Sequence, residues 1–420
     1  MFSAACAVQR SDVDRCPGVI ALHPANDGLL ARLRVPGGRL TAAQLSALAR
    51  AASLGNGVVE ITSRANIQLR GLPRSAERPL RSILGRAGLV PSPAHDRVLN
   101  VIASPLAGRH SRSRADTDGL LRRLVEGICA QPDLTRLPGR ILFSLDDGSG
   151  LALRPAADLA LTALGSDTFT LTIAGQPTRT ALPAERASDV AVSAALVFTK
   201  LREALGERGR RIWRIAELDD GAQAIAQRLG LQLVSSPAGA SPGSGTACTC
   251  GRELAPGRLV QRDGRVALTA LAPLGRLDPQ RLAALAQLAP ELRLGTGRTL
   301  TLRDLSPAAA SRLSTRLIEL GLVLDGGSGW VGLSACSGFG ACRRAAVDLR
   351  AAIEERARRR RPGQAHEHWA ACERRCGERS DQRLAVATRD GSLLVRIDGA
   401  AVEAGSVEEA LSLLAGASEP

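Results

Sequence analysis

Apolar and polar residues alternate in two well-separated stretches of the chain, and a helical pattern follows each of them. Residues 29–35 read LLARLRV and residues 266–272 read VALTALA, and this period of two is typical of strands with one buried face. The first helix has Thr41 as its N-cap with Gln44 three residues on, and the second has Asp278, followed by a proline at the first helical position. Each stretch then continues as two short strands around an arginine and a second helix. The pattern therefore predicts the order β-α-β-β-α twice.

The two stretches form an internal repeat, with residues 28–90 as the first copy and residues 265–323 as the second. Pro36 matches Pro273 at an offset of 237, and Arg70 matches Arg303 at an offset of 233. A duplicated α+β unit predicts two halves related by a pseudo-two-fold axis. A site shared between the halves would be lined by matched residues, for which we expect Arg64 and Arg298.

The similarity continues beyond each copy, where residues 97–108 align with residues 329–340. We expect Ala103 to stand where the second copy has Cys336, so that the thiols belong to one half only. A segment rich in Pro, Gly, Ser and Ala separates the halves and predicts a linker. The expected boundaries are 1–95 for the first half-repeat, 96–234 for the domain that follows it, 235–254 for the linker, 255–325 for the second half-repeat and 326–420 for the last domain.

Composition narrows the class of ligand. The 420 residues carry a net charge of +14, and Lys200 is the one lysine among 55 basic residues. Arginine forks suit carboxylates and phosphates, but 2% aromatic content and no tyrosine leave few platforms for stacking bases. A small polyanion is therefore favoured over nucleic acid. Neither a membrane-spanning stretch nor a secretory signal is recognisable, which predicts a cytoplasmic protein with no membrane partner.

Nine cysteines in such a chain suggest metal or redox chemistry. Cys336 and Cys342 form a C-x5-C pair, and Cys372 and Cys376 form a C-x3-C pair. We expect Cys342 near the start of a helix, whose N-terminal N–H groups would stabilise thiolates. A C-x5-C loop is wider than the usual zinc loop and favours a [4Fe–4S] cluster, with zinc or no metal as alternatives. The arginine run at 356–363 is interpreted as the solvated end of that helix, with docking of an acidic electron donor as the rival.

The repeat, the stretch TSRANIQL at 62–69 and the two cysteine pairs together resemble the nitrite and sulfite reductase superfamily. Within it, the chain looks most like the precorrin-3B synthase family, to whose opening RCPGVIALHPANDGLLARLRVPGG at 15–38 is similar. Further stretches follow in the family's order at 103–108, 137–148, 334–342 and 368–376. The resemblance covers nearly the whole chain and is weakest across 150–250. It implies an α+β fold of duplicated nitrite/sulfite reductase-like halves, with ferredoxin-like half-domains joined to cluster and tetrapyrrole domains. By this resemblance, the two half-repeats would be ferredoxin-like, 96–234 a nitrite/sulfite reductase-like domain without cluster ligands, and 326–420 the cluster-binding domain.

The resemblance also implies an activity, namely O2-dependent hydroxylation of precorrin-3A, a polycarboxylate tetrapyrrole, with closure of a γ-lactone. Electrons would come from NAD(P)H through a reductase or a ferredoxin, and a non-haem iron would activate oxygen. The cluster ligands would be Cys336, Cys342, Cys372 and Cys376. The tetrapyrrole would meet Arg64, Asn66, Gln68, Arg140 and Arg298. By chemistry alone, candidate iron ligands are His23, His110, His366, His368 and Cys16.

Two departures bear on the alternatives. Siroheme-dependent sulfite reductases carry a Lys-x-Lys pair where this chain has Arg140 and Leu142, which disfavours an anion reductase. The interior of CERRC at 372–376 lacks the Pro-x-Gly-like turn usual for the second cysteine pair. The runner-up is a siroheme-dependent sulfite or nitrite reductase, and siroheme is expected only in that case. A non-enzymatic metal-binding protein is the third reading.

Overall fold

The structure is a computed structural model. It describes residues 14–153, 156–234, 253–345, 347–378, 383–387, 392–397 and 400–416. The predicted linker lies almost entirely outside the described residues, and so do Cys248 and Cys250. Within the described part, no helix is both long and apolar enough to cross a membrane.

The first ferredoxin-like half-repeat contains the predicted β-α-β-β-α order, with two further short strands, β1 and β3, before the first helix. Its elements are β1 (His23–Ala25), β2 (Gly28–Leu33), β3 (Arg39–Thr41), α1 (Ala42–Ala52), β4 (Val59–Ile61), β5 (Ile67–Leu72) and α2 (Glu77–Arg86). The capping box of α1 is present, since the Thr41 hydroxyl accepts from the Gln44 N–H and the Gln44 side chain accepts from the Thr41 N–H. Helix α1 thus begins where the sequence predicts.

The second half-repeat follows the same order. Its elements are β11 (Gly257–Val260), β12 (Val266–Leu271), β13 (Arg276–Leu277), α7 (Pro279–Leu288), β14 (Glu291–Leu294), β15 (Thr299–Leu305) and α8 (Pro307–Glu319). Asp278 and Ser306 cap α7 and α8 by accepting backbone N–H groups, and a proline opens each helix. Both caps agree with the sequence pattern.

The two half-repeats exchange a strand, which the sequence pattern did not predict. One sheet has the order β1-β2-β5-β4-β13 and the other has the order β11-β12-β15-β14-β3. Strand β13 thus completes the first sheet by pairing with β4, and β3 completes the second by pairing with β14. The reciprocal exchange confirms the pseudo-two-fold arrangement of the halves.

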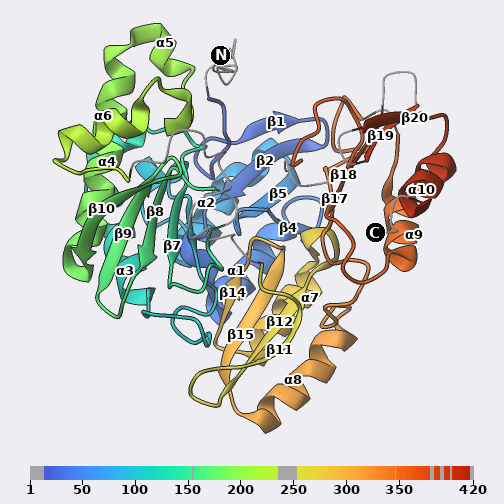
Figure 1. Cartoon of the computed structure of the whole chain (residues 1–420). Helices are drawn as coiled ribbons and strands as arrows, with labels where there is room; N and C mark the ends of the chain where they lie inside the picture. The colour runs from blue at the N-terminus through green and yellow to red at the C-terminus, as the bar shows by residue number, and fades with distance from the viewer. Residues whose placement is uncertain are drawn as a thin grey trace.

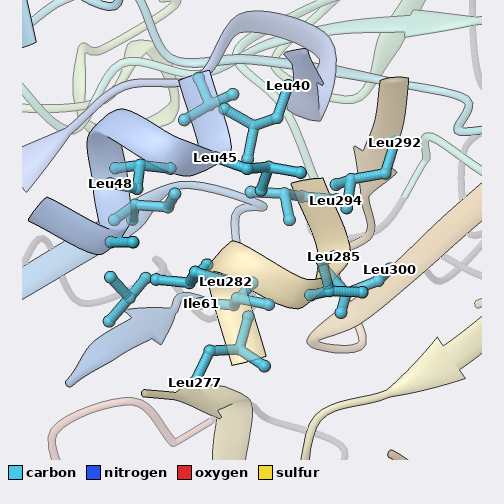
Figure 2. Packing of buried hydrophobic residues seen from close by; sticks show 14 of the residues in the cluster. Leu40, Leu45, Leu48, Ile61, Leu277, Leu282, Leu285, Leu292, Leu294 and Leu300 are labelled. Atoms are coloured by element: carbon cyan, nitrogen blue, oxygen red, sulfur yellow. The ribbon is translucent and has the colours of Figure 1, made fainter. Parts of the chain in front are cut away.

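A single apolar core joins the half-repeats, because α1 and α7 pack against each other between the two sheets. Figure 2 shows leucines of α1, such as Leu45 and Leu48, facing Leu282 and Leu285 of α7. Both Leu45 and Leu48 are buried. Neither half-repeat would keep this surface from water alone, so the two fold as one unit.

An α/β domain follows each half-repeat. The two α/β domains lie on opposite sides of the pair of half-repeats; the first is coloured cyan to green and the second orange to red in Figure 1. The first has β6 (Val101–Ala103), α3 (Asp118–Cys129), β7 (Phe143–Asp146), β8 (Leu159–Ala163), β9 (Thr168–Ile173), β10 (Gln176–Pro183), α4 (Ala184–Ala204), α5 (Gly206–Arg210) and α6 (Gly221–Arg228). The second has β16 (Leu333–Ala335), α9 (Arg350–Arg359), β17 (Glu367–Ala370), β18 (Arg383–Ala387), β19 (Leu393–Ile397), β20 (Ala400–Ala404) and α10 (Val407–Gly416). Short 3-10 turns lie at Pro36–Gly38, Arg74–Ala76, Pro93–His95, Pro132–Arg136, Ile215–Glu217 and Pro273–Gly275.

These flanking domains share one topology. In the first, β6, β7 and β8 run parallel and β9 and β10 return antiparallel. In the second, β16, β17 and β18 run parallel and β19 and β20 return antiparallel. The duplication therefore extends over the whole chain, and the α+β, duplicated, pseudo-two-fold fold class is confirmed.

Candidate functional site

A cavity of about 1080 Å³ lies where the two half-repeats meet the flanking domain that contains β16 and β17. Its walls come from β1, β2 and β5, from the turn between β4 and β5, from the segment around Arg140, and from the loops after β16 and β17. All nine predicted site residues line it: Arg64, Asn66, Gln68, Arg140, Arg298, Cys336, Cys342, Cys372 and Cys376.

The four cysteines reach this cavity from two neighbouring loops. Cys336 follows β16 directly, and Cys372 and Cys376 follow β17. Because β16 and β17 are parallel neighbours, their carboxyl ends lie at the same edge of the sheet. The backbone N–H of Ala371 also donates to the Cys336 Sγ, at 3.3 Å. The order of the strands thus brings two pairs, far apart in sequence, to one site.

The thiols are electrostatically linked. Burial raises the pKa of the Cys336 thiol, and the neighbouring Cys372 and Cys376 raise it further. Burial, Cys372 and Cys342 likewise raise the pKa of Cys376. Several thiolates so close together need a cation or cluster to balance them. Within the described residues, no three His, Cys, Asp or Glu side chains close on a single metal ion.

The prediction that Cys342 lies near the start of a helix is wrong. Cys342 lies in a loop, and α9 begins at Arg350. Leu349 is the N-cap of this helix and Ile353 on it is buried. Individual backbone N–H groups therefore replace a helix terminus as the donors to these thiols, as at Ala371.

The arginine run was expected to be a solvated helix end, and this is wrong for two of its members. Arg356 and Arg360 point inward and bond to Glu367 of β17, all three with side chains no more than 2% exposed. Arg358 and Arg359 behave as expected and pair with Glu355 at the surface. Residues four apart on a helix lie on the same face, so Arg356 and Arg360 both face the core. A run of consecutive arginines does not show from sequence alone which of them face inward.

The counterpart of Cys336 is Ser104, whereas the sequence alignment placed Ala103 there. Ala103 is the last residue of β6 and pairs with Leu145, just as Ala335 ends β16 and pairs with Trp369. The Ser104 N–H donates to the Leu145 carbonyl and the Cys336 N–H donates to the Trp369 carbonyl. The first half thus keeps the same turn without a thiol at this position.

Arg64 and Arg298 both line the cavity but do not occupy matched positions. The turn 62–66 closes with the Thr62 N–H donating to the Asn66 carbonyl, and the turn 295–299 closes in the same way. Arg298 has a φ of 60° and corresponds to Ala65, whose φ is 53°. The expectation of a symmetric arginine pair is therefore wrong, because the alignment is displaced by one residue there.

The cavity is strongly basic. The arginines lining it are Arg32, Arg34, Arg64, Arg70, Arg140, Arg276, Arg298, Arg343, Arg344, Arg350, Arg374 and Arg375, and the carboxylates are Glu60, Asp348 and Glu378. Arg70 pairs with Asp27, and Arg375 pairs with Glu378. Among the described residues of the wall, arginines therefore outnumber carboxylates by twelve to three, which gives it a large excess of positive charge.

Two of these arginines, Arg32 and Arg34, were not singled out from the sequence. Arg34 is buried, its Nε has no hydrogen-bond partner among the described residues, and burial with the neighbouring Arg32 lowers its pKa to about 9. The Arg32 Nε is likewise unpartnered there, and burial lowers its pKa. Arg32 lies on β2 and Arg34 directly follows it, and their sequence carried a signal, because charged residues within a buried apolar stretch often face a site.

Arg64 and Arg140 support each other at the same end of the cavity. The Arg64 Nη1 donates to the Arg140 carbonyl at 3.0 Å, and the Arg140 guanidinium lies 5.0 Å from the ring centre of Trp213. Burial, Arg214 and Arg140 lower the pKa of Arg64 to about 10. An anionic ligand would relieve this crowding of like charge.

Asn66 and Gln68 also line the cavity, but their amides bond to the protein. The Asn66 Oδ1 accepts from the Val35 N–H, and its Nδ2 donates to the Asn100 Oδ1 at 2.8 Å. Gln68 bridges Arg32 and Glu60. Both amides therefore hold neighbouring strands and arginines in place. This role differs from the direct contact with a ligand that was expected for Asn66 and Gln68.

Of the five candidate iron ligands, only Cys16 and His23 line the cavity. The His110 Nδ1 accepts from the Arg112 N–H. His366 lies against Gly332. His368 is fully buried, with both ring nitrogens in hydrogen bonds, and burial with the nearby Arg298 lowers its pKa to about 4. The described residues thus bring together no ligand set for a non-haem iron.

Residues 23–87 match the nitrite/sulfite reductase ferredoxin-like half domain. Among curated proteins, the precorrin-3B synthase of Sinorhizobium sp is 30% identical over 202 residues, which is 46% of this chain and 43% of that protein. A ferredoxin–nitrite reductase of Synechococcus elongatus is 31% identical over 149 residues, covering 33% of this chain and 29% of the relative. The sulfite reductase [NADPH] hemoprotein beta-component of Acidithiobacillus ferrooxidans is 40% identical over 104 residues, covering 24% and 18%.

The chain thus spans less than half the length of each of these curated relatives. Among solved structures, the NirA protein of Mycobacterium tuberculosis superposes with a TM-score of 0.71 at 18% identity, over 92% of this chain and 79% of that one. At that identity the likeness concerns the fold. The matched half domain, the sequence relatives and this fold agree with one another, and each of them is similar to nitrite and sulfite reductase-like proteins.

Proposed function

We propose that the chain is a precorrin-3B synthase, an oxidoreductase that hydroxylates precorrin-3A with O2 and closes a γ-lactone. The observation that carries the proposal is the basic cavity between the halves, with twelve arginines and three carboxylates on its walls. A tetrapyrrole that keeps its acetate and propionate groups is a polycarboxylate of matching charge. Each guanidinium can hold a carboxylate through two parallel hydrogen bonds.

The burial of these arginines supports a ligand role. Arg34 and Arg64 hold their charge at a cost, because burial and neighbouring arginines lower the pKa of both. A carboxylate placed against them would offset that cost, and the unpartnered Nε of Arg34 leaves a donor for it. Arginines that only improve solubility would instead lie at the surface, where water solvates the guanidinium and its ion pairs contribute little.

The cysteines supply the second part of the proposal. Cys336, Cys342, Cys372 and Cys376 would hold a [4Fe–4S] cluster, which transfers single electrons when bound. Burial raises the pKa of the Cys336 thiol, and the Ala371 N–H, which donates to its Sγ, acts in the opposite direction and favours the thiolate that would bind such a group. The electron donor would be NAD(P)H acting through a reductase or a ferredoxin.

The reaction balances with that donor. One oxygen atom of O2 enters the macrocycle as a hydroxyl group, and the other leaves as water after taking up two electrons and two protons. The ring-A acetate then closes the lactone: its oxygen forms a C–O bond to a ring carbon beside the hydroxylated position, a C=C π bond of the macrocycle breaks, and the carboxyl proton passes to the macrocycle, with no further change of oxidation state. The arginines bind and orient the carboxylates, and Asn66 and Gln68 keep Val35 and Arg32 in register. We assign no ligands to a non-haem iron and derive no step through one.

A siroheme-dependent nitrite or sulfite reductase is the alternative, and the relatives with those names favour it. Against it, Leu142 is completely buried among apolar residues. The side chain at this position therefore cannot reach an anion in the cavity, as the second lysine of a Lys-x-Lys pair would. Arg140 alone remains on the wall.

Anaerobic purification followed by optical and EPR spectra, with iron, sulfide and zinc analysis, separates these functions. The proposal expects about four iron and four sulfide per chain in the cluster, no siroheme absorption, and consumption of precorrin-3A only when O2 and a reductant are present. Siroheme bands would support the alternative. Zinc in place of iron, with no turnover, would indicate a non-enzymatic metal-binding protein.

A further inference from the structure

A histidine of β17 is bonded to the loop that carries the fourth cysteine. The His368 Nε2 lies 3.0 Å from the carbonyl oxygen of Cys376, and the His368 Nδ1 lies 2.9 Å from the Ser334 Oγ. Because a carbonyl only accepts, Nε2 must carry the proton in this bond. His368 is fully buried, so water does not compete for the bond.

The same connection exists in the half that has no cluster cysteines. The Ser144 Oγ of β7 donates to the carbonyl of Ala152. Ser144 pairs with Ile102 of β6 as His368 pairs with Ser334 of β16, so the two occupy equivalent positions. In both halves the bonded carbonyl lies eight residues after the strand residue. The duplicated frame thus closes this loop with a bond from a strand side chain to a carbonyl.

The interiors of the two loops differ. In the first half, the buried Asp146 carboxylate accepts from the N–H groups of Gly148, Gly150 and Ala152, and so fills its loop. The equivalent residue of β17, two positions after His368, is Ala370. An alanine at this position of β17 cannot accept such bonds, and the His368 imidazole bonds β17 to the far end of the loop.

The backbone next to Cys376 is fitted to the imidazole. Gly377 has a φ of +99°, and a Cβ built there would lie 3.1 Å from the His368 Cε1. A side chain at this position would be strained and would also crowd the ring. The glycine lets the chain turn directly against His368, which keeps the Cys376 carbonyl within reach.

We propose that His368 is a positioning residue for Cys376: its Nε2–H holds the Cys376 carbonyl and thereby the second pair of cysteines in the arrangement that binds the cluster. The inference rests on the proposed function, because it takes the four cysteines to be cluster ligands. His368 acts through the backbone of Cys376 and is not itself a ligand.

The test compares three variants of the full chain, purified anaerobically with their cluster. His368→Leu removes the donor with similar volume, and His368→Gln keeps an N–H donor on the side chain. Ser144→Ala removes the equivalent bond in the half without cysteines. The measurements are the rate of iron release to a chelator, the EPR spectrum of the reduced cluster, and the unfolding temperature.

We expect His368→Leu to release iron about fivefold to tenfold faster than the wild type, the factor for one ordinary hydrogen bond, and to broaden the EPR signal. His368→Gln should restore both. Ser144→Ala should lower the unfolding temperature without changing either cluster readout. Equal release rates in His368→Leu and the wild type, or faster release in Ser144→Ala as well, would overturn the inference and leave the proposed function standing. A wild type without iron and sulfide would overturn both, whereas a cluster without turnover of precorrin-3A would overturn the proposed function alone.

Discussion

Glu367 bonds to two buried arginines, Arg356 of α9 and Arg360 at its C-cap, and its neutralisation should strongly destabilise the domain that contains α9 and β17. The Arg356 Nε and Nη2 donate to its two oxygens at 3.0 and 2.6 Å, and the Arg360 Nε donates at 3.2 Å. In Glu367→Gln, both guanidinium charges would stay buried without a counter-charge.

The magnitude follows from burial. All three side chains are no more than 2% exposed, and removing one partner of such a pair costs about 3–5 kcal/mol. Arg360 also donates to the carbonyls of Gly329 and Val331, so it cannot turn outward without breaking those bonds. We therefore expect a loss of about 3 kcal/mol or more in the free energy of unfolding.

The assay is urea unfolding followed by tryptophan fluorescence, since Trp369 is fully buried on the same strand and Trp330 packs against the same core. Glu355→Gln is the matched control, because Glu355 also pairs with two arginines of α9 but does so at the surface. It should unfold like the wild type. A loss below about 1 kcal/mol for Glu367→Gln, or equal losses in both variants, would refute the reasoning from burial.

Three further predictions concern the shared core, the cavity and acid stability. Leu48→Ala, in the core between α1 and α7, should lower the free energy of unfolding by about 2–5 kcal/mol in urea titrations, because the surrounding helices cannot fill the cavity completely. Arg34→Met should raise the unfolding temperature of the ligand-free protein, because it removes a buried charge whose pKa is lowered to about 9. The same variant should bind uroporphyrin III, an octacarboxylate probe, about tenfold or more weakly in fluorescence titrations. Tighter binding would contradict the assignment of Arg34 to the carboxylate-binding wall. Asp118 accepts from Arg293 and Arg303, and these charges, against an opposing effect of burial, lower its pKa. Its stabilisation should be complete above the ordinary carboxyl pKa and lost as the pH falls through the lower folded value, so Asp118→Asn should flatten unfolding temperature against pH in that acid range.

Local patterns were sufficient for the helix starts and for the duplication. Thr41, Asp278 and Ser306 each cap a helix through a hydrogen bond to a residue three positions further on. Such short-range interactions can be predicted from the sequence. The exchange of β3 and β13 was not predicted, because two- and three-residue strands carry too little pattern and their partners lie in the other half.

The candidate site was predicted in its residues more than in its contacts. The nine residues named from the sequence line one cavity, whereas the alignment of Ala103 with Cys336 and of Arg64 with Arg298 was displaced by one residue. Turns of equal length in the two halves differ in sequence, so letters alone could not fix their register. The inward side of the arginine run depends on Glu367, which lies on a different element. Arg32 and Arg34 were overlooked because a strand with one solvent-exposed face is expected to carry a polar residue at every second position, whether or not a ligand binds there.

The central claim is that the basic cavity and the four cysteines serve the oxygenation of a polycarboxylate tetrapyrrole. The most direct measurement is the mass of the product formed from precorrin-3A by the anaerobically purified protein, with a chemical or enzymatic reductant, under isotopically labelled O2. The account predicts a product that has gained one labelled oxygen atom, with none from labelled water at the hydroxyl group. Unchanged precorrin-3A in the presence of an intact, reducible cluster, or a hydroxyl oxygen derived from water, would contradict it.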